Sequence, residues 1–438
     1  MVYKVSIKNP IISGDIHLVS SKSESNRALI IQTLCKNKFT LHNLSKADDT
    51  QLLQSLLSSK KKILDCENAG TVLRFLTAYF AMQTGKTVIL TGTARMKERP
   101  IGKLVDMLRK LGAQINYLER NGYAPIEIHG TELKGGYLEA DATISSQFIS
   151  AILLIAPLLP EALTIELTGT IVSKPYIQMT LGIMQHFGIH VKREGNMIKI
   201  NPQEYVAADY TIENDWSAAS YWYEMAAFSE KVDLTLHGLK KDSLQGDAVV
   251  AGIFTDFGIQ TTYLKNKIHL TRTAERTNNY INTAYPNEVA HFTYDFIHHP
   301  DLTQTLAVTT AAQNMIATFS RVKNLKIKES DRIQTLKTEL KKIGIKLKEV
   351  DLGSEIDEHD DVSIEITPAE LKRADEATVI ETHNDHRIAM AFAPLALKMG
   401  FINIENPNVV KKSYPNFWDD LKSVGFEIKA VKPILITN

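Results

Sequence analysis

The chain has 438 residues, enough for two or three domains, and its hydrophobic fraction of 44% excludes a globally disordered protein. Lysine plus arginine and aspartate plus glutamate number 50 each, so the formal net charge is zero, which argues against a non-specific nucleic-acid binder. Two cysteines without CxxC spacing argue against a disulfide framework or a zinc site, and the lack of a signal peptide or membrane-spanning run predicts a cytoplasmic protein.

Five segments share one pattern, in which an amphipathic helix ends at a glycine and an apolar strand follows. Glycine just after a helix is typical of a left-handed C-cap. The segment 52–64 resembles a sixth copy that lacks the glycine. The five helices with their glycines are expected over residues 104–112, 177–188, 249–258, 335–344 and 417–425.

A second type of helix alternates with the first. These helices begin with small or polar residues and are apolar nearly all round, which predicts that they are buried. Two helices and three or four short strands form a unit too small to fold alone, so we expect six units in two groups of three, with the crossing near 210–215. The expected helix starts are 21–27, 68–71, 144–147, 215–217, 300–303 and 384–387.

The segment 95–100 concentrates charge, with three cations and one carboxylate in six residues. Pro100 suits the first position of the helix that follows, so we expect the cations at a helix N-terminus, where an anion is favoured. Similar cations precede the later amphipathic helices. If equivalent ends of the repeats face one another across two domains, these cations converge on one cleft that binds polyanionic ligands.

Three carboxylates, Asp301, Glu329 and Asp331, stand among these cations. Asp331 is interpreted as an ion-pair partner, and Asp301 could simply cap a helix. Acid–base chemistry on a bound anion nevertheless requires such a group within reach. His383 and His386 have the spacing of a helical metal pair, but no further ligand is apparent from the sequence, so no metal site is expected.

Nine motifs together resemble those of the 5-enolpyruvylshikimate-3-phosphate synthase family, over residues 16–418. The resemblance implies an α/β (α+β) fold, a two-domain inside-out α/β barrel of six βαβαββ repeats, three per domain. It assigns 14–213 to the N-terminal domain, whose first repeat is shortened, and 1–13 with 214–438 to the C-terminal domain, with the active site in the cleft between them. The motifs are 22–27, 68–71, 95–102, 145–148, 172–176, 243–247, 300–301, 328–332 and 384–387.

The resemblance also implies an activity, the transfer of the enolpyruvyl group of phosphoenolpyruvate to the 5-hydroxyl of shikimate-3-phosphate, in the pathway to chorismate and aromatic amino acids. It implies no metal and no organic cofactor, because cations stabilise the charge. The expected partners are the two small-molecule substrates, with no nucleic acid and no membrane, and the protein is expected to be a monomer.

Site residues are carried over from the family by position. Asp301 would orient or deprotonate the 5-hydroxyl, and Glu329 would shuttle the proton at the methylene carbon, with Lys22 as a partner. Shikimate-3-phosphate would be held by Lys22, Ser23, Arg27, Ser145, Ser146, Gln147, Ser173, Tyr176, Asp301, Asn324 and Lys328. Phosphoenolpyruvate would be held by Lys22, Gly70, Arg99, Gln147, Arg332, Arg387 and Lys412, with Gly70 avoiding a Cβ that would crowd the ligand.

The sequence departs from the family pattern at three places. The stretch 57–68 is shorter than the usual hairpin, Phe75 stands where proline is common, and Val19-Ser20-Ser21 replaces the usual Pro-Gly. Two alternatives remain. A UDP-N-acetylglucosamine enolpyruvyl transferase commonly has a cysteine in the loop that corresponds to 93–102, and this chain has none there. A non-catalytic phosphometabolite-binding protein would gain nothing from the carboxylates of Asp301 and Glu329.

Overall fold

The computed structural model describes residues 1–143, 145–274, 281–282, 289–352, 361–367, 371, 375 and 378–431. The expected helix-start residue Ile144 and the part of the range 214–438 beyond residue 431 lie outside these. The chain divides into two compact units. We call Ser20–Glu213 with Leu244–Gly246 the 20–213 unit, and Met1–Val19, Asn214–Ser243 and Asp247–Asn438 the 214–438 unit.

The first boundary differs from the expected one, which lay between residues 13 and 14. Strand β2 (Ile11–His17) pairs in parallel with β13 (Lys231–His237), from Ile11 beside Lys231 to His17 beside His237. Because all of β2 forms ladder hydrogen bonds within this sheet, the chain leaves the 214–438 unit only after Val19.

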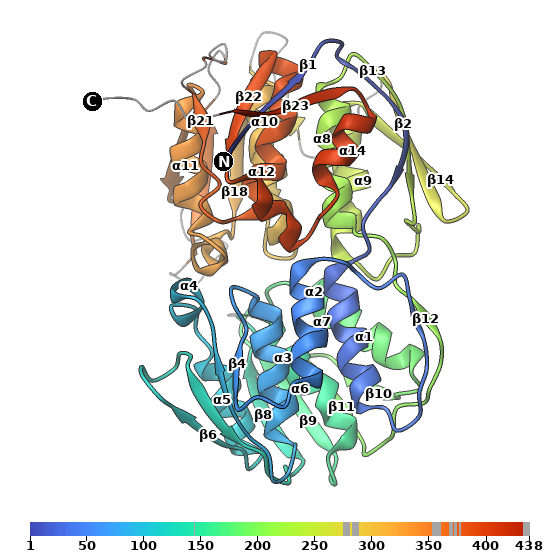
Figure 1. Cartoon of the computed structure of the whole chain (residues 1–438), viewed down its shortest axis with the longest axis vertical. Helices are drawn as coiled ribbons and strands as arrows, with labels where there is room; N and C mark the ends of the chain where they lie inside the picture. The colour runs from blue at the N-terminus through green and yellow to red at the C-terminus, as the bar shows by residue number, and fades with distance from the viewer. Residues whose placement is uncertain are drawn as a thin grey trace. The chain divides into compact units, whose positions relative to one another are not determined.

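In the 20–213 unit, three buried helices, α1, α3 and α6, contact one another (Figure 1). Every residue of α3 except Thr71 is buried, as its apolar sequence predicted. The partly exposed α5 and α7 pack beside them. The helices of this unit are α1 (Lys22–Leu34), α2 (Asp48–Ser58), α3 (Gly70–Ala81), α4 (Ala94–Lys97), α5 (Gly102–Lys110), α6 (Ser146–Ile155) and α7 (Lys174–His186).

Two four-stranded sheets of this unit have the same topology. Each has one parallel pair joined through a buried helix, followed by two antiparallel pairs, in the orders β4-β5-β7-β6 and β8-β9-β11-β10. This is the expected βαβαββ repeat. The strands are β4 (Ile63–Asp65), β5 (Thr87–Thr91), β6 (Gln114–Tyr117), β7 (Ile126–His129), β8 (Gly136–Asp141), β9 (Leu163–Thr168), β10 (Val191–Glu194) and β11 (Met197–Ile200).

The first repeat is shortened, as the resemblance implied. Its sheet has only two short parallel strands, β3 (Leu41–His42) and β12 (Tyr210–Thr211). The strand expected at the end of this repeat, within 60–64, instead forms β4, which belongs to the next sheet because it pairs in parallel with β5. Helices α1 and α2 of this repeat are both present and pack against each other.

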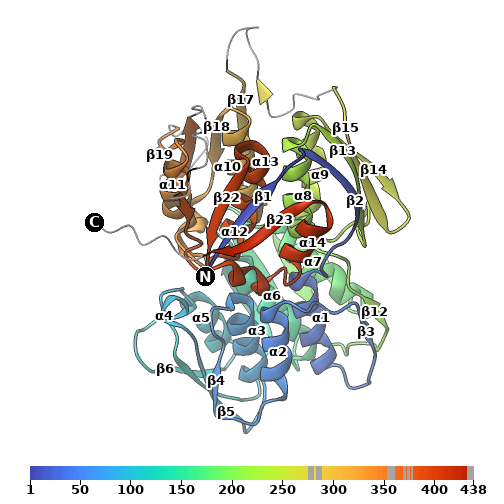
Figure 2. The ribbon, with the colours of Figure 1, turned by 45° about the horizontal axis from the view of Figure 1, so that its top comes forward.

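The 214–438 unit repeats this arrangement around α8, α10 and α12, which contact one another (Figure 2). In the described residues its sheet orders are β14-β15-β13-β2, β16-β17-β18-β20-β19 and β21-β22-β1-β23. Its α-helices are α8 (Trp216–Phe228), α9 (Val250–Ile253), α10 (Thr303–Ala312), α11 (Arg332–Lys342), α12 (His386–Phe392), α13 (Ala396–Met399) and α14 (Phe417–Ser423). Its other strands are β1 (Val2–Ile7), β14 (Ile259–Leu264), β15 (Lys267–Arg272), β16 (Ile281–Asn282), β17 (His291–Asp295), β18 (Ile316–Ser320), β19 (Lys346–Val350), β20 (Ser363–Thr367), β21 (Val379–Ile380), β22 (Phe401–Glu405) and β23 (Phe426–Val431).

The five glycines that defined the repeat all have positive φ angles. The values lie between 75° and 101°, a region that side chains other than glycine rarely adopt. Each glycine follows the last turn of a helix and precedes a strand, so the predicted left-handed C-caps are confirmed. They are Gly112, Gly188, Gly258, Gly344 and Gly425.

The charged segment 95–100 differs from its prediction. Arg95 and Lys97 lie in their own short helix, α4, which Thr93 caps, and α5 begins only at Gly102. Pro100 is therefore not the first residue of α5. The cations do not gather at the start of that helix, and only Arg99 is buried. No helix in the described part of the chain has both the length and the apolar character needed to cross a bilayer.

Candidate active site

Arg27 lies inside the 20–213 unit, with 2% of its surface exposed. Its Nε donates to Thr180 Oγ1 over 2.7 Å, and its Nη1 donates to the carbonyl of Ser23 over 2.8 Å. Its Nη2 donates to Ser150 Oγ and to the carbonyl of Tyr176, both over 3.3 Å. Burial lowers the pKa of Arg27 to about 10, so the guanidinium keeps its charge at neutral pH. All of these acceptors are neutral, and they join α1 to α6 and α7.

Phe75, which departs from the family pattern, lies beside this arginine. The ring of Phe75 is buried, and its centre lies 5.5 Å from the guanidinium carbon of Arg27. At this distance a buried ring attracts the cation through its quadrupole. Phe75 therefore acts on the environment of Arg27.

Gly70, the first residue of α3, is packed against two guanidinium groups. A Cβ at this position would lie 2.7 Å from Arg99 Nη2, 2.9 Å from Arg99 Nη1 and 2.9 Å from Arg74 Nη1. Arg74 in turn donates to the carbonyls of Gly70 over 3.1 Å and Pro100 over 2.9 Å. The glycine was expected to make room for a ligand. In this structure it makes room for arginine side chains.

Other predicted residues of the 20–213 unit cluster near helix starts. Lys22 Nζ forms an ion pair with Asp49 Oδ2 over 2.9 Å, and both side chains are largely buried. Ser145 caps α6 by accepting the N–H of Gln147, and Gln147 Nε2 donates to Thr71 Oγ1 over 3.3 Å, which links the starts of α6 and α3. Ser173 precedes α7 with a left-handed φ of 53°.

In the 214–438 unit, Arg332 at the start of α11 joins three carboxylates. Its Nη1 lies 3.0 Å from Asp301 Oδ1, and its Nη2 lies 2.9 Å from Glu329 Oε2. Its Nε lies 2.8 Å from Asp385 Oδ2. The Arg332 side chain is 1% exposed, whereas Asp301 and Glu329 keep 19% and 12% of their side-chain surface exposed. These two acids can therefore still meet a ligand.

Each of these two acids has a second cation nearby. Arg387 Nη2 lies 2.8 Å from Asp301 Oδ2, and Lys412 Nζ lies 3.8 Å from Glu329 Oε1. Arg387 Nη1 also donates to the carbonyl of Asp301 over 3.2 Å. Both acids are thus fixed between cations, which aligns their oxygens and neutralises their charge.

The cations change the ionisation of Asp301. Burial alone would raise its pKa, but Arg387, Lys328 and Arg332 outweigh burial and hold the pKa well below its usual range. Asp301 is therefore ionised and able to accept a proton. Nearby Asp247 behaves differently, because burial and the charge of Asp301 raise its pKa to about 7.

Comparisons with known proteins match the chain to one family. The profile of EPSP synthase (3-phosphoshikimate 1-carboxyvinyltransferase) matches residues 52–421. The chain belongs to the EPSP synthase family. It is 43% identical over 419 residues to the 3-phosphoshikimate 1-carboxyvinyltransferase of Bacteroides fragilis, covering 95% of this chain and 97% of that protein. The Pasteurella multocida enzyme of the same name is 36% identical over 447 residues, covering 94% and 96%.

Solved EPSP synthases share the fold. An EPSP synthase structure from Acinetobacter baumannii superposes with a TM-score of 0.74 over 98% of this chain and 100% of that chain, at 22% identity. A second structure from the same organism gives a TM-score of 0.74 over 99% and 100%, at 21% identity. At this identity the likeness concerns the fold alone. It confirms the two-domain inside-out α/β fold expected of an EPSP synthase.

The structure brings the predicted residues together in two sets, one in each unit. Asn324 belongs to the second set by position, and its buried Oδ1 has no hydrogen-bond partner among the described residues. The first set is Lys22, Ser23, Arg27, Gly70, Arg99, Ser145, Ser146, Gln147, Ser173 and Tyr176. The second set is Asp301, Asn324, Lys328, Glu329, Arg332, Arg387 and Lys412.

Sequence reasoning missed several neighbours of these sets. Asp49, Asp385 and Tyr221 contact Lys22, Arg332 and Arg387 respectively. Asp385 offered a signal, because it belongs to the helix-start motif 384–387 and an aspartate there is a typical N-cap. Its bond to Arg332, 53 positions away, depends on tertiary contact.

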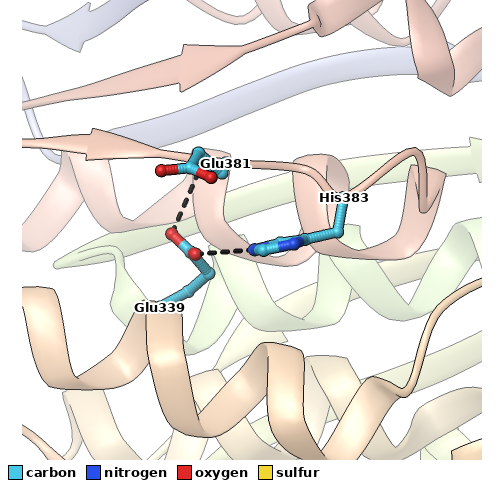
Figure 3. Close-up of side chains that lie close together, drawn as sticks. All are labelled: Glu339, Glu381 and His383. Carbon is cyan, nitrogen blue, oxygen red and sulfur yellow. Dashed lines mark hydrogen bonds and ion pairs between the residues drawn. The ribbon is translucent and has the colours of Figure 1, made fainter.

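His383 and His386 do not form a metal pair on one helix, because α12 begins at His386 and His383 lies in the preceding turn. His383 instead meets Glu339 and Glu381, whose ligand atoms all lie within 4.8 Å of one another (Figure 3). The ammonium of Lys342 already pairs with Glu339 over 2.9 Å and with Glu381 over 3.0 Å. The positive charge of the cluster is therefore supplied by a lysine.

Proposed function

We propose that this chain transfers the enolpyruvyl group of phosphoenolpyruvate to the 5-hydroxyl of shikimate-3-phosphate and releases phosphate. The observation that carries the proposal is Arg332, which holds Asp301 and Glu329 on one guanidinium while leaving both acids partly exposed. A protein that only binds anions gains nothing from two carboxylates fixed among its cations. Enolpyruvyl transfer needs one base and one acid that are held apart.

In the proposed mechanism, Asp301, which the neighbouring cations keep ionised, orients the 5-hydroxyl and takes its proton as the new bond forms. Glu329 enters the step in its protonated form and gives that proton to the methylene carbon of phosphoenolpyruvate, and the 5-oxygen forms a bond to the adjacent carbon. The resulting tetrahedral intermediate returns a methyl proton to the Glu329 carboxylate as its bond to the phosphate oxygen breaks, which restores the double bond. The proton held by Asp301 leaves with the phosphate. Arg332, Arg387 and Lys412 would stabilise the negative charge on the phosphate and carboxylate throughout.

The binding roles in the proposal follow charge and hydrogen-bonding chemistry. Hydroxyl groups at the starts of α6 and α7 suit the 3-phosphate, because helix N-termini favour anions. The charged Arg27 suits the carboxylate of shikimate-3-phosphate. Phosphoenolpyruvate would be bound by Lys22, Gly70, Arg99, Gln147, Arg332, Arg387 and Lys412. Shikimate-3-phosphate would be bound by Lys22, Ser23, Arg27, Ser145, Ser146, Gln147, Ser173, Tyr176, Asp301, Asn324 and Lys328.

A phosphate-release assay tests the proposal. We expect release with phosphoenolpyruvate and shikimate-3-phosphate, without added metal or cofactor, and no release when UDP-N-acetylglucosamine is the acceptor. The second acceptor tests the related transferase, whose loop cysteine has no counterpart in 93–102. Well-folded protein that releases no phosphate with the first pair would refute the proposed activity. Tight binding of both substrates without release would favour the non-catalytic alternative.

The proposal includes a cytoplasmic monomer. The two cysteines form no disulfide, which suits a reducing compartment. The small substrates require no second chain, nucleic acid or membrane. Sedimentation at micromolar concentration tests the monomer, and a stable dimer would contradict it.

A further inference from the structure

Asp385 is a fully buried carboxylate at the start of α12, and it touches two of the proposed ligand-binding arginines. Its Oδ1 accepts the backbone N–H of Arg387 over 3.0 Å, which caps the helix. Its Oδ2 accepts the Nε of Arg332 over 2.8 Å and the hydroxyl of Ser330 over 3.3 Å. Its own N–H donates to the carbonyl of Thr382 over 2.8 Å. Both oxygens are therefore engaged, and the side chain has a single orientation.

These contacts decide how the Arg332 guanidinium is turned. The group is planar, with five donors in a fixed fork, so holding the Nε atom fixes the directions of both Nη atoms. Those two atoms pair with Asp301 and Glu329. Asp385 thus sets the plane in which Arg332 presents its remaining donors to the two acids. Among the described residues, Asp385 itself forms no hydrogen bond with either acid.

We propose that Asp385 is a positioning residue for the transfer reaction, which acts by fixing the orientation of Arg332 and, through it, the spacing of Asp301 and Glu329. The inference rests on the proposed roles of these three residues. Asp385 itself has no exposed surface, so it cannot touch a substrate. Its contribution is the geometry that it imposes on groups that can.

The chain offers a matched control in Glu339, a second fully buried carboxylate that joins α11 to the segment before α12. Its Oε2 accepts the N–H of Glu381 over 3.0 Å, and its Oε1 lies 2.8 Å from His383 Nε2 (Figure 3). Like Asp385, it takes one backbone N–H and pairs with side-chain nitrogens, here those of His383 and Lys342. In the described part of the chain, Glu339 forms no hydrogen bond or ion pair with Arg332, Asp301 or Glu329, so it joins the same elements without orienting the arginine.

The decisive experiment compares D385N with E339Q in the phosphate-release assay. Asparagine presents one oxygen and one NH2 group, so it cannot accept from both Arg332 Nε and the Arg387 N–H. We expect D385N to lower kcat/KM for phosphoenolpyruvate about 100-fold, the scale of a reacting group misplaced by an ångström. We expect E339Q to keep kcat/KM within about threefold while lowering the unfolding midpoint, because it weakens the contacts of Glu339 with His383, Glu381 and Lys342 and leaves Arg332 in place.

A pH profile separates positioning from a simple charge effect. Asp301 is surrounded by Arg387, Lys328, Arg332, Glu329 and Asp247. If Arg332 turns away in D385N, Asp301 loses a cation and its pKa rises, so the acidic limb of kcat/KM moves toward neutral pH. If Asp385 acted only as a nearby anion, its removal would lower that pKa, and the limb would move to lower pH.

The outcomes are distinct. Equal losses of kcat/KM in D385N and E339Q, or an acidic limb that stays or moves to lower pH in D385N, would overturn the positioning role. D385E, which keeps the charge but displaces the carboxylate by one methylene, is expected to stay impaired, and near-wild-type activity in it would also overturn the role. Wild-type protein that releases no phosphate would instead defeat the proposed function.

Discussion

Four buried arginines of the two units contact different kinds of partner. In the 20–213 unit, Arg27 and Arg74 donate to carbonyls, hydroxyls and a thioether. In the 214–438 unit, Arg332 and Arg387 pair with carboxylates. The positive charge of a guanidinium among neutral acceptors remains available to attract an anionic ligand. A guanidinium among carboxylates is partly neutralised by them, and it fixes their positions. The Lys22–Asp49 pair is an exception in the first unit.

From this contrast we infer that the two sets of residues have different functions, which we call the division between the sets. The first set is suited to binding anionic substrates. The second is suited to proton transfer, because its acids are held in defined positions by cations. Four substitutions test the division, and they follow from the largest expected effect to the smallest.

Glu329→Gln removes an acid from the charge-paired set while keeping its shape. We expect kcat to fall by about 10²–10⁴-fold, the usual contribution of a general acid, with substrate affinity nearly unchanged. Phosphate release gives kcat, and calorimetry gives affinity. Asp331→Asn is the control, because Asp331 is a nearby carboxylate that caps α11 by accepting the backbone N–H of Gln334. Loss of binding in Glu329→Gln would assign Glu329 a structural role.

Arg27→Lys tests the set with neutral acceptors. Lysine cannot reach the hydroxyls of Thr180 and Ser150 and both backbone carbonyls at once, so buried polar groups lose their partner. We expect the free energy of unfolding to fall by about 1–3 kcal/mol, and shikimate-3-phosphate to bind more weakly. Chemical denaturation and calorimetry measure the two effects. Unchanged stability combined with a large loss of kcat would contradict the division between the sets.

Glu224→Gln examines an acid of the 214–438 unit that lacks a cation. Glu224 on α8 is fully buried, and neither carboxyl oxygen has a hydrogen-bond partner among the described residues. Burial raises its pKa well above the usual value, so the folded protein holds this proton while the unfolded chain releases it. Stability is therefore full below the unfolded pKa and is lost as pH rises. Relative to Glu224→Gln, the wild type should lose about 1.4 kcal/mol per pH unit while the folded acid stays protonated.

Denaturation of both proteins between pH 6 and 8 measures this slope. A parallel pH dependence of the two proteins would show that Glu224 is ionised in the fold. Glu230→Gln serves as the control, because Glu230 is an exposed acid of the same unit.

Gly70→Ala has the smallest expected effect. The new Cβ would lie within 3.0 Å of the Arg99 and Arg74 guanidiniums, which can shift because they are the ends of flexible side chains. We expect KM for phosphoenolpyruvate to rise about tenfold, or about 1.4 kcal/mol, with little change in kcat. Stability should hold, since alanine favours the helix by up to about 1 kcal/mol. An unchanged KM would remove Arg99 from the proposed phosphoenolpyruvate residues.

Much of the fold could be predicted from local sequence. The five C-cap glycines and the buried helix α3 follow from conformational and burial preferences that depend only on residues close together in the sequence. The pairing of β4 with β5 in the next sheet could not be predicted, because the sequence of a three-residue strand does not specify which strand it pairs with. The first domain boundary was misplaced for the same reason, since only pairing with β13 shows where β2 belongs.

By itself, the sequence determined the repeat, its caps and the residue types of both sets, because backbone preferences and charge are properties of single residues and their neighbours. Tertiary structure decided which partner each charged group meets. Asp385 meets Arg332, and Gly70 meets Arg99. Such pairs are joined by helix packing over long stretches of chain. Their geometry depends on the way in which side chains far apart in the sequence pack together, and no local sequence pattern encodes that packing.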